Sequence, residues 1–215
     1  MPIAILFSSL ILLAALIACE KTDAPLLRLL VKSVLSALFL VAALLATRGF
    51  SLPFTLLFIG LCFCFAGDVL LAVPSKKAFL AGLVCFAFGH LFYAACFLIL
   101  SGGNPAFLLG LAVCAVLGTL VLRQLRPFLG SMKGPVVFYV TVISLMMAAA
   151  CSLLVLQSLS TQARAMAFGG ALAFYFSDLF VARHRFVKKS FLNRLVGLPL
   201  YYSGQFLLAA FAANL

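Results

Sequence analysis

Acidic residues are scarce in this chain of 215 residues, which holds four, Glu20, Asp23, Asp68 and Asp178, against 15 lysines and arginines. Long polar stretches are lacking too, because 67% of the residues are apolar and only 9% are charged. This composition leaves almost no sequence for a water-soluble domain. It indicates an integral membrane protein.

Metal-binding patterns are lacking as well. The chain has two histidines, His90 and His184, and His184 lies in a basic loop. One histidine with two aspartates would be a poor zinc site, which disfavours a metal-dependent lipid hydrolase. The seven cysteines lie mostly in apolar runs, where they behave as small hydrophobic residues and not as a disulfide framework. We therefore expect neither a metal nor a cofactor.

Eight apolar runs are long enough for membrane-spanning helices, each of which needs about 20 mostly apolar residues. The alternating pattern of barrel strands is missing from these runs, and the short connections between them carry turn-forming residues. We therefore predict an all-α fold, a single polytopic bundle of eight transmembrane helices over residues 1–215. The predicted helices lie near residues 2–18, 26–46, 52–74, 78–100, 105–122, 134–156, 163–182 and 191–213.

The positions of the basic residues predict the topology. The even-numbered loops hold only Arg48 and Arg164. By the positive-inside rule the odd-numbered loops face the cytoplasm, and both termini lie on the other side. We expect the protein to lie in a bacterial inner membrane. The net charge of +11 then reflects topology and some attraction to lipid headgroups, and not nucleic-acid binding. The basic residues at the odd loops are Lys21, Arg28, Lys76, Lys77, Arg123, Arg126, Lys133, Arg183, Arg185, Lys188, Lys189 and Arg194.

The first apolar run has an alternative interpretation as a cleaved signal, because Leu16-Ile17-Ala18-Cys19 resembles a lipoprotein cleavage box. A signal peptide carries positive charge ahead of its apolar segment. No lysine or arginine precedes this run. We therefore interpret it as the first membrane helix.

Two carboxylates, Asp68 and Asp178, fall inside apolar runs. A carboxylate within a bilayer is costly unless it is protonated, paired or exposed to a wet cavity, so it indicates function. Measured along the helices, Asp68 lies roughly 12 Å from Lys76 and Asp178 roughly 8 Å from Arg183. Both carboxylates are therefore expected at a similar depth, near the cytoplasmic leaflet.

Other polar side chains are expected in the same half of the membrane. Lys32 lies roughly 6 Å along its helix from Arg28, close enough to the edge to extend to the headgroups instead. Each tyrosine alone could be a packing or interfacial aromatic, and the histidine and glutamine could simply bond neighbouring helices. Together they predict one polar cluster in the inner half of the bundle. Its candidate members beside the aspartates are Lys32, His90, Tyr93, Tyr139, Ser177, Tyr201, Tyr202 and Gln205.

The surroundings of the two aspartates also resemble each other. The segments 65–72 and 175–182 both read aromatic, any residue, small, Asp, three apolar residues and Ala. They lie on helices of the same direction, four helices apart, as a repeat of four plus four helices would place them. Small residues at Gly169, Ala173 and Ser177 predict a close helix contact beside Asp178.

Several of these residues, in their order and spacing, resemble the YhhN family, which includes lysoplasmalogenases. The resemblance spans about residues 28 to 210. The residues that carry it are Lys32, Gly67-Asp68, Phe79, Gly82, Phe86, His90, Tyr93, Tyr139, Ser177-Asp178, Tyr201, Tyr202 and Gln205.

The resemblance implies an eight-helix membrane hydrolase with two catalytic aspartates, whose substrate is a lysophospholipid. It would cleave the vinyl ether bond of lysoplasmalogens to a fatty aldehyde and a glycerophospho-choline or -ethanolamine. In a host without plasmalogens, another lysolipid or ether lipid would be the substrate.

Vinyl ether hydrolysis needs an acid and a base. The acid protonates the β-carbon, and water then adds to the resulting oxocarbenium ion. Two carboxylates in one low-dielectric pocket supply this pair, because one stays protonated while the other stays ionised. The sequence leaves open which aspartate carries the proton. Lys32 would hold the ionised partner or the substrate phosphate, and the other polar residues of the cluster would position water or glycerol hydroxyls.

A proton-coupled transporter or channel is the main alternative, because it too uses buried carboxylates and internal repeats. Such a protein needs polar groups on both sides of the midplane. Here the outer half is nearly bare of them, which favours an enzyme open to one leaflet. A non-catalytic lipid-binding or structural protein is a third possibility, in which the aspartates would be replaceable.

Overall fold

A computed structural model describes residues 3–22 and 24–215, and all regular structure in these ranges is helical. Eight of the described helices are long and apolar enough to cross a membrane, which confirms the predicted all-α fold and marks a multi-pass integral membrane protein. They are α1 (Ile3–Thr22), α2 (Pro25–Ala46), α3 (Leu52–Ala72), α4 (Lys76–Ser101), α5 (Pro105–Leu125), α6 (Lys133–Leu153), α7 (Thr161–Ala182) and α8 (Phe191–Phe211).

Helix ends follow local capping chemistry. Ser51 and Ser160 accept hydrogen bonds from backbone N–H groups in the first turns of α3 and α7, which satisfies donors left free at a helix start. α1 continues beyond its predicted end, because Glu20 and Lys21 remain helical. The predicted start of that helix, Pro2, lies outside the described residues.

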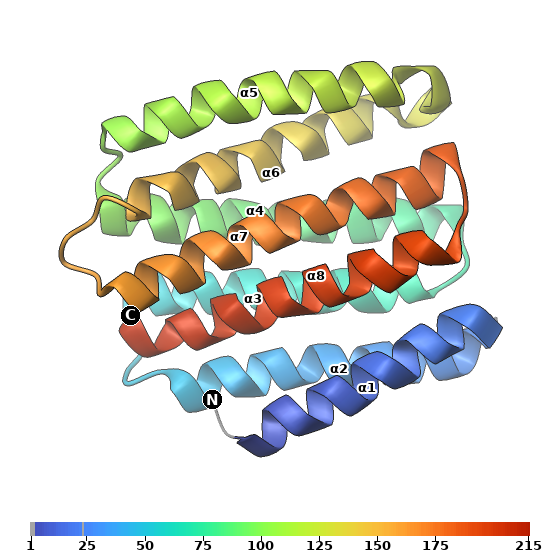
Figure 1. The fold of residues 1–215 in the computed structure, drawn as a ribbon, viewed down its shortest axis with the longest axis horizontal. Helices are drawn as coiled ribbons and strands as arrows, with labels where there is room; N and C mark the ends of the chain where they lie inside the picture. Colours follow the sequence, from blue (N-terminus) through green and yellow to red (C-terminus); the bar gives the residue numbers. More distant parts are fainter. Residues whose placement is uncertain (1–2, 23) are drawn as a thin grey trace.

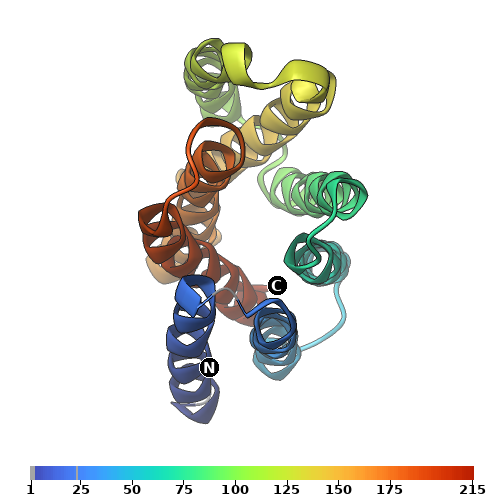
Figure 2. The same cartoon turned by 90° about the vertical axis from the view of Figure 1, so that its right-hand side faces the viewer.

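Four connections lie at the end of the bundle away from both termini (Figure 1), here called the loop end. Figure 1 shows the α1–α2, α3–α4, α5–α6 and α7–α8 connections at one end and both termini at the other. Seen end-on, the pair α3–α4 and the pair α7–α8 lie on opposite sides of the bundle (Figure 2). α6 contacts both α4 and α7, and α2 contacts both α3 and α8, so these two helices join the pairs. This arrangement brings the loop ends of α2, α3, α4, α6, α7 and α8 together.

Both tight pairs are held by glycines that face each other. A Cβ at Gly60 would lie 3.0 Å from the carbonyl oxygen of Gly89, and one at Gly170 would lie 3.0 Å from that of Gly204. The close contact on α7 uses Gly170, whereas a Cβ at Gly169, the first residue of the predicted small-residue stripe, would meet only Leu207 at 3.7 Å. Glycine thus lets the backbones approach more closely than any side chain would allow.

The two pairs share a register. Gly60 precedes Asp68 on α3 by as many residues as Gly170 precedes Asp178 on α7. Equivalent contacts of this kind support the proposed repeat of four plus four helices, which stays a prediction.

The half of the bundle near the termini is filled by apolar side chains. Phe97 of α4 and Phe211 of α8 are buried, with ring centroids 6.1 Å apart. Met146 and Leu153 of α6 belong to the same buried core. Asp68, Asp178 and Lys32 lie in the other half, toward the four connections.

Candidate active site

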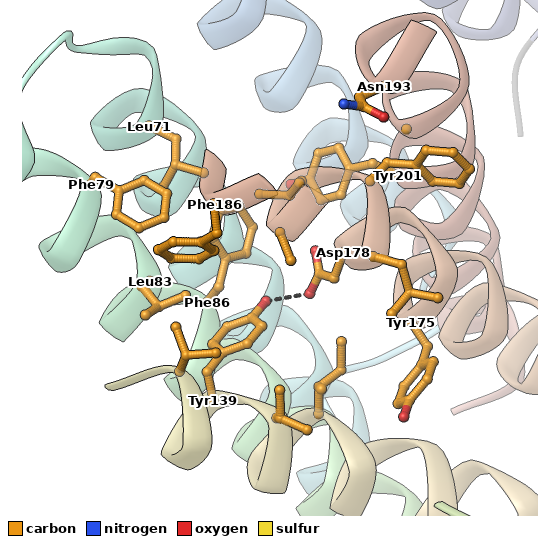
Figure 3. Close-up of a pocket in the computed structure, with 18 of the residues that line it drawn as sticks. Leu71, Phe79, Leu83, Phe86, Tyr139, Tyr175, Asp178, Phe186, Asn193 and Tyr201 are labelled. Atoms are coloured by element: carbon orange, nitrogen blue, oxygen red, sulfur yellow. Dashed lines mark hydrogen bonds between the residues drawn. The ribbon is translucent and has the colours of Figure 1, made fainter. Parts of the chain in front are cut away.

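A cavity of about 100 Å³ lies in the half of the bundle near the loops (Figure 3). Asp68 and Asp178 both line it, as expected if the two carboxylates share one site. Most of its wall is apolar, which makes a low-dielectric setting that strengthens interactions between charges. The apolar lining includes Leu71, Phe79, Leu83, Phe86, Val121, Leu125, Val136, Val140 and Ile143.

Asp68 is enclosed by hydrogen-bond donors. Its side chain is 1% exposed, and the Lys32 Nζ lies 2.9 Å from Oδ1. Oδ2 accepts hydrogen bonds from the Ser36 hydroxyl at 2.6 Å and from the Tyr201 hydroxyl at 2.5 Å. A carboxyl group that receives a cation and two hydroxyl donors acts only as an acceptor, so this arrangement fits an ionised Asp68.

A second layer of donors supports this arrangement. Because the Ser36 hydroxyl donates to the carboxylate, it accepts from the Tyr202 hydroxyl 3.1 Å away. The Gln205 amide donates to the Tyr201 oxygen at 3.1 Å, and its own oxygen accepts from the Tyr93 hydroxyl at 2.9 Å. Every bond in this chain points toward the same buried negative charge.

Asp178 has fewer partners and faces the cavity. Its side chain is 18% exposed, and its Oδ2 accepts a hydrogen bond from the Tyr139 hydroxyl at 2.5 Å (Figure 3). His90 Nε2 lies 3.0 Å from the Tyr139 oxygen and 3.9 Å from Asp178 Oδ2. In the ion pairs of the described residues, Asp178 has no lysine or arginine partner comparable to Lys32.

The hydrogen positions follow from this geometry. Since the Tyr139 hydroxyl donates to Asp178, His90 Nε2–H must donate to Tyr139. His90 Nδ1 is buried and has no hydrogen-bond partner among the described residues. A proton there would be a buried, unpaired donor, which is costly, so the geometry fits a neutral imidazole.

A buried aromatic ring separates the two networks. The Phe174 ring lies 4.5 Å from the imidazole of His90 and 5.1 Å from the ring of Tyr201, measured between centroids. Its edge-on packing fixes both side chains without adding a polar group. The two carboxylates thus share a cavity but have separate partners.

Most of the candidate residues from the sequence meet in these two networks, and Ser177 does not. The Ser177 hydroxyl donates to the Phe174 carbonyl of its own helix at 2.7 Å. A Cβ at Gly197 would lie 3.7 Å from the Ser177 carbonyl oxygen, so the residue packs at the α7–α8 contact. Among the described residues, no group of three His, Cys, Asp or Glu side chains is arranged to hold a metal ion.

Three residues of the cavity region were missed by sequence reasoning. Ser36 lies one helical turn after Lys32, so it shares a helix face with it, and that spacing was its only signal. Asn193 and Arg194, on the first turn of α8, line the cavity as well. Sequence reasoning counts Arg194 among the basic residues of the odd-numbered loops and not among the site residues.

A comparison with known protein families identifies the family of this chain. The family model of the YhhN family matches residues 27–212. The chain belongs to the YhhN family. This match confirms the resemblance found in the sequence, and it spans all the candidate residues from Lys32 to Gln205.

Similar curated proteins of the family come from mammals. The chain is 35% identical over 162 residues to lysoplasmalogenase TMEM86A of Homo sapiens and 33% identical to the Bos taurus protein of the same name. In both cases the match covers 74% of this chain and 66% of the relative's length. No solved structure matches the chain significantly.

Proposed function

We propose that this chain hydrolyses the vinyl ether bond of a single-chain ether lipid of the lysoplasmalogen type. The products would be a fatty aldehyde and a glycerophospho-choline or -ethanolamine. One observation carries the proposal: two carboxylates with different hydrogen-bond partners line one largely apolar cavity among membrane helices. The names of the mammalian relatives support the same reaction.

Asp178 is the better candidate for the acid. It faces the cavity and receives one hydroxyl donor on Oδ2, which leaves Oδ1 for the transferable proton. Asp68 instead pairs with the Lys32 ammonium through Oδ1 and accepts two hydroxyl donors on Oδ2, an arrangement that fits the ionised form. Different surroundings thus divide the roles of two identical side chains, as in other paired-carboxylate enzymes.

The reaction balances with these two groups. The Asp178 carboxyl gives its proton to the β-carbon of the vinyl ether, and an oxocarbenium ion forms at the carbon bonded to oxygen. Water adds to that carbon and returns a proton to the Asp178 carboxylate. The resulting hemiacetal breaks its bond to the glycerol oxygen, which gives the aldehyde and a free glycerol hydroxyl.

Asp68 serves the charged intermediate. Its negative charge lies in the same cavity and is fixed before the reaction begins, so it stabilises the developing cation without reorganisation. Lys32 keeps this carboxylate ionised, and the hydroxyls of Ser36 and Tyr201 hold its orientation. The apolar wall of the cavity suits the fatty chain and limits access of water.

The cavity position suits a lipid substrate better than a transported solute. The cavity lies near the loops, whereas Phe97, Phe211 and Met146 fill the opposite half of the bundle. A transported solute would have to pass that packed half. We place the site at the cytoplasmic leaflet of a bacterial inner membrane, with both termini on the other side, because the basic residues gather at the loop end.

A lipid panel tests the proposal. Purified protein in detergent is incubated with three lysophospholipids of the same chain length, with a vinyl ether, an alkyl ether or an ester linkage. We expect aldehyde from the vinyl ether and no cleavage of the other two, because only the vinyl ether forms an oxocarbenium ion on protonation of carbon. Ester cleavage, or an intact vinyl ether, would reject the proposal.

A further inference from the structure

A carboxylate at the loop end of the bundle is shared by two arginines. The Glu20 Oε2 lies 3.4 Å from Arg28 Nη1 and 3.6 Å from Arg194 Nε. Glu20 comes from the last turns of α1, Arg28 from the first turn of α2 and Arg194 from the first turn of α8. The three side chains are 9%, 18% and 27% exposed. Three helices therefore hold two guanidinium groups in a partly desolvated place.

Arg194 belongs to the cavity as well as to this cluster. It lines the same space as both aspartates. Its Nε is buried and lacks a hydrogen-bond partner among the described residues, since the Glu20 oxygen at 3.6 Å is too far. Lys32, one helical turn from Arg28, lines the cavity too. This side of the cavity thus has positive charge and, at Arg194 Nε, unused donor capacity.

The cavity is graded from charged to apolar. Figure 3 shows Asn193, the neighbour of Arg194, on one side of Asp178 and Leu83 on the other. Lys32 and Arg194 thus line one part of the cavity, and apolar side chains of α4, α5 and α6 line another. A lysolipid likewise has a charged phosphate at one end and an apolar chain at the other.

We propose that Arg194, with Arg28 beside it, binds the phosphate of the lipid whose linkage reaches Asp178. A guanidinium matches phosphate with two parallel hydrogen bonds, and Glu20 pairs with both guanidiniums when no phosphate is bound. This assignment rests on the proposed function, because it names the headgroup of the same substrate. It explains why a charged cluster adjoins an otherwise apolar cavity.

Binding measurements with full-length protein in detergent test this site. The two ligands are an alkyl ether lysophospholipid, which lacks the vinyl ether bond, and an alkyl glycerol with the same chain and no phosphate. We expect Arg194→Gln to weaken binding of the lysophospholipid about 10- to 100-fold, the range of one or two charge-assisted hydrogen bonds, and to leave alkyl glycerol binding unchanged. Equal effects on both ligands, or no effect, would overturn the proposal.

Two further variants separate recognition from folding. Glu20→Gln removes the carboxylate that competes with phosphate, so lysophospholipid binding should tighten. If the cluster were purely structural, Glu20→Gln and Arg194→Gln would both weaken lysophospholipid binding. Arg194→Lys keeps the positive charge but loses the two parallel N–H donors of the guanidinium, so it should weaken lysophospholipid binding less than Arg194→Gln does. Arg123→Gln, at the same end of the bundle but outside the cavity lining, is the matched control and should bind as wild type.

The source of the phosphate is tested by competition. Millimolar inorganic phosphate should leave lysophospholipid binding unchanged. Displacement by inorganic phosphate in the wild type but not in Arg194→Gln would reveal a site for free phosphate and overturn the headgroup assignment. The binding ligands carry no vinyl ether, so binding and hydrolysis are measured separately. Phosphate-dependent binding of these ligands, combined with no cleavage of the vinyl ether lipid in the lipid panel, would reject only the proposed reaction. Hydrolysis without phosphate-dependent binding would reject the phosphate site alone.

Discussion

Asp68 and Lys32 form a buried ion pair at 2.9 Å. Charges out of water are tolerated when they are paired and hydrogen-bonded, and removal of one partner leaves the other uncompensated. Asp178 differs because its hydrogen-bond partner, Tyr139, is neutral, and Tyr139 in turn accepts from His90, which is neutral in this geometry. The two aspartates should therefore respond differently to the same substitution.

Lys32→Met leaves Asp68 as an unpaired buried carboxylate. We expect the free energy of unfolding to fall by about 3–5 kcal/mol, the cost of breaking a buried pair. Reversible unfolding in mixed detergent measures this change. The double variant Lys32→Met with Asp68→Asn should recover much of the loss, because no charge remains to be compensated. A double variant no more stable than Lys32→Met would contradict the ion-pair account.

Asp178→Asn should separate catalysis from stability. The amide oxygen still accepts from Tyr139, and no buried cation is left unpaired, so we expect a change below about 1 kcal/mol in the free energy of unfolding. Aldehyde release should fall by about 10²- to 10⁴-fold, because the transferable proton is gone. Asp68→Asn is the comparison, since it leaves Lys32 unpaired and should lose both stability and activity. Full activity in Asp178→Asn would exclude it as the acid.

At the scale of the helices, the sequence predicted the number and approximate positions of the helices, which depend on the length of the apolar runs. It predicted little that depends on how each helix is rotated about its own axis. Eight runs became eight helices because their length and hydrophobicity suffice. Helix ends were missed where polar residues such as Glu20 and Arg123 continue the helix past the apolar run. The cluster of polar residues was predictable because each lies within an apolar run, where it needs a partner.

The pairing within that cluster was not predictable from the sequence. Which partners each aspartate receives depends on how each helix is rotated and on packing by Phe174. Ser36 resembles any small residue of a membrane helix until Asp68 is seen 2.6 Å away. The Glu20–Arg194 contact joins α1 and α8, which are far apart in the sequence, so no local sequence pattern predicts it.

Gly170 and Gly169 give a matched test of the α7–α8 contact. A Cβ at Gly170 would lie 2.9 Å from the Leu208 Cγ and 3.0 Å from the Gly204 carbonyl oxygen, whereas one at Gly169 has ordinary contact distances. Gly170→Ala should therefore cost about 1–3 kcal/mol through overpacking, and Gly169→Ala should be nearly neutral. Unfolding curves of the two variants measure the difference. Equal stabilities would argue against the backbone contact.

At the scale of the whole molecule, the two ends of the bundle have opposite characters. Four connections lie at the end away from the termini (Figure 1). Most of the basic residues and the cavity lie at this end, and packed apolar side chains fill the other half. This asymmetry suits an enzyme that takes its substrate from one leaflet.

Cysteine labelling tests the orientation. In a background without the seven native cysteines, Ser131→Cys marks the α5–α6 connection and Ser158→Cys the α6–α7 connection; both residues are exposed. We expect a membrane-impermeant thiol reagent to label Ser158→Cys in intact cells and Ser131→Cys only after cell lysis, since basic loops stay in the cytoplasm. The reverse pattern would place the cavity at the outer leaflet.

The most direct test of the proposed reaction is hydrolysis of a vinyl ether lysophospholipid in D₂O, followed by mass spectrometry of the aldehyde. Transfer of a proton from a carboxyl group in exchange with solvent to the β-carbon predicts one deuterium at the carbon next to the aldehyde group. This label should appear with the wild type and be lost, together with turnover, in Asp178→Asn. Aldehyde without deuterium at that carbon, or no aldehyde at all, would contradict the account.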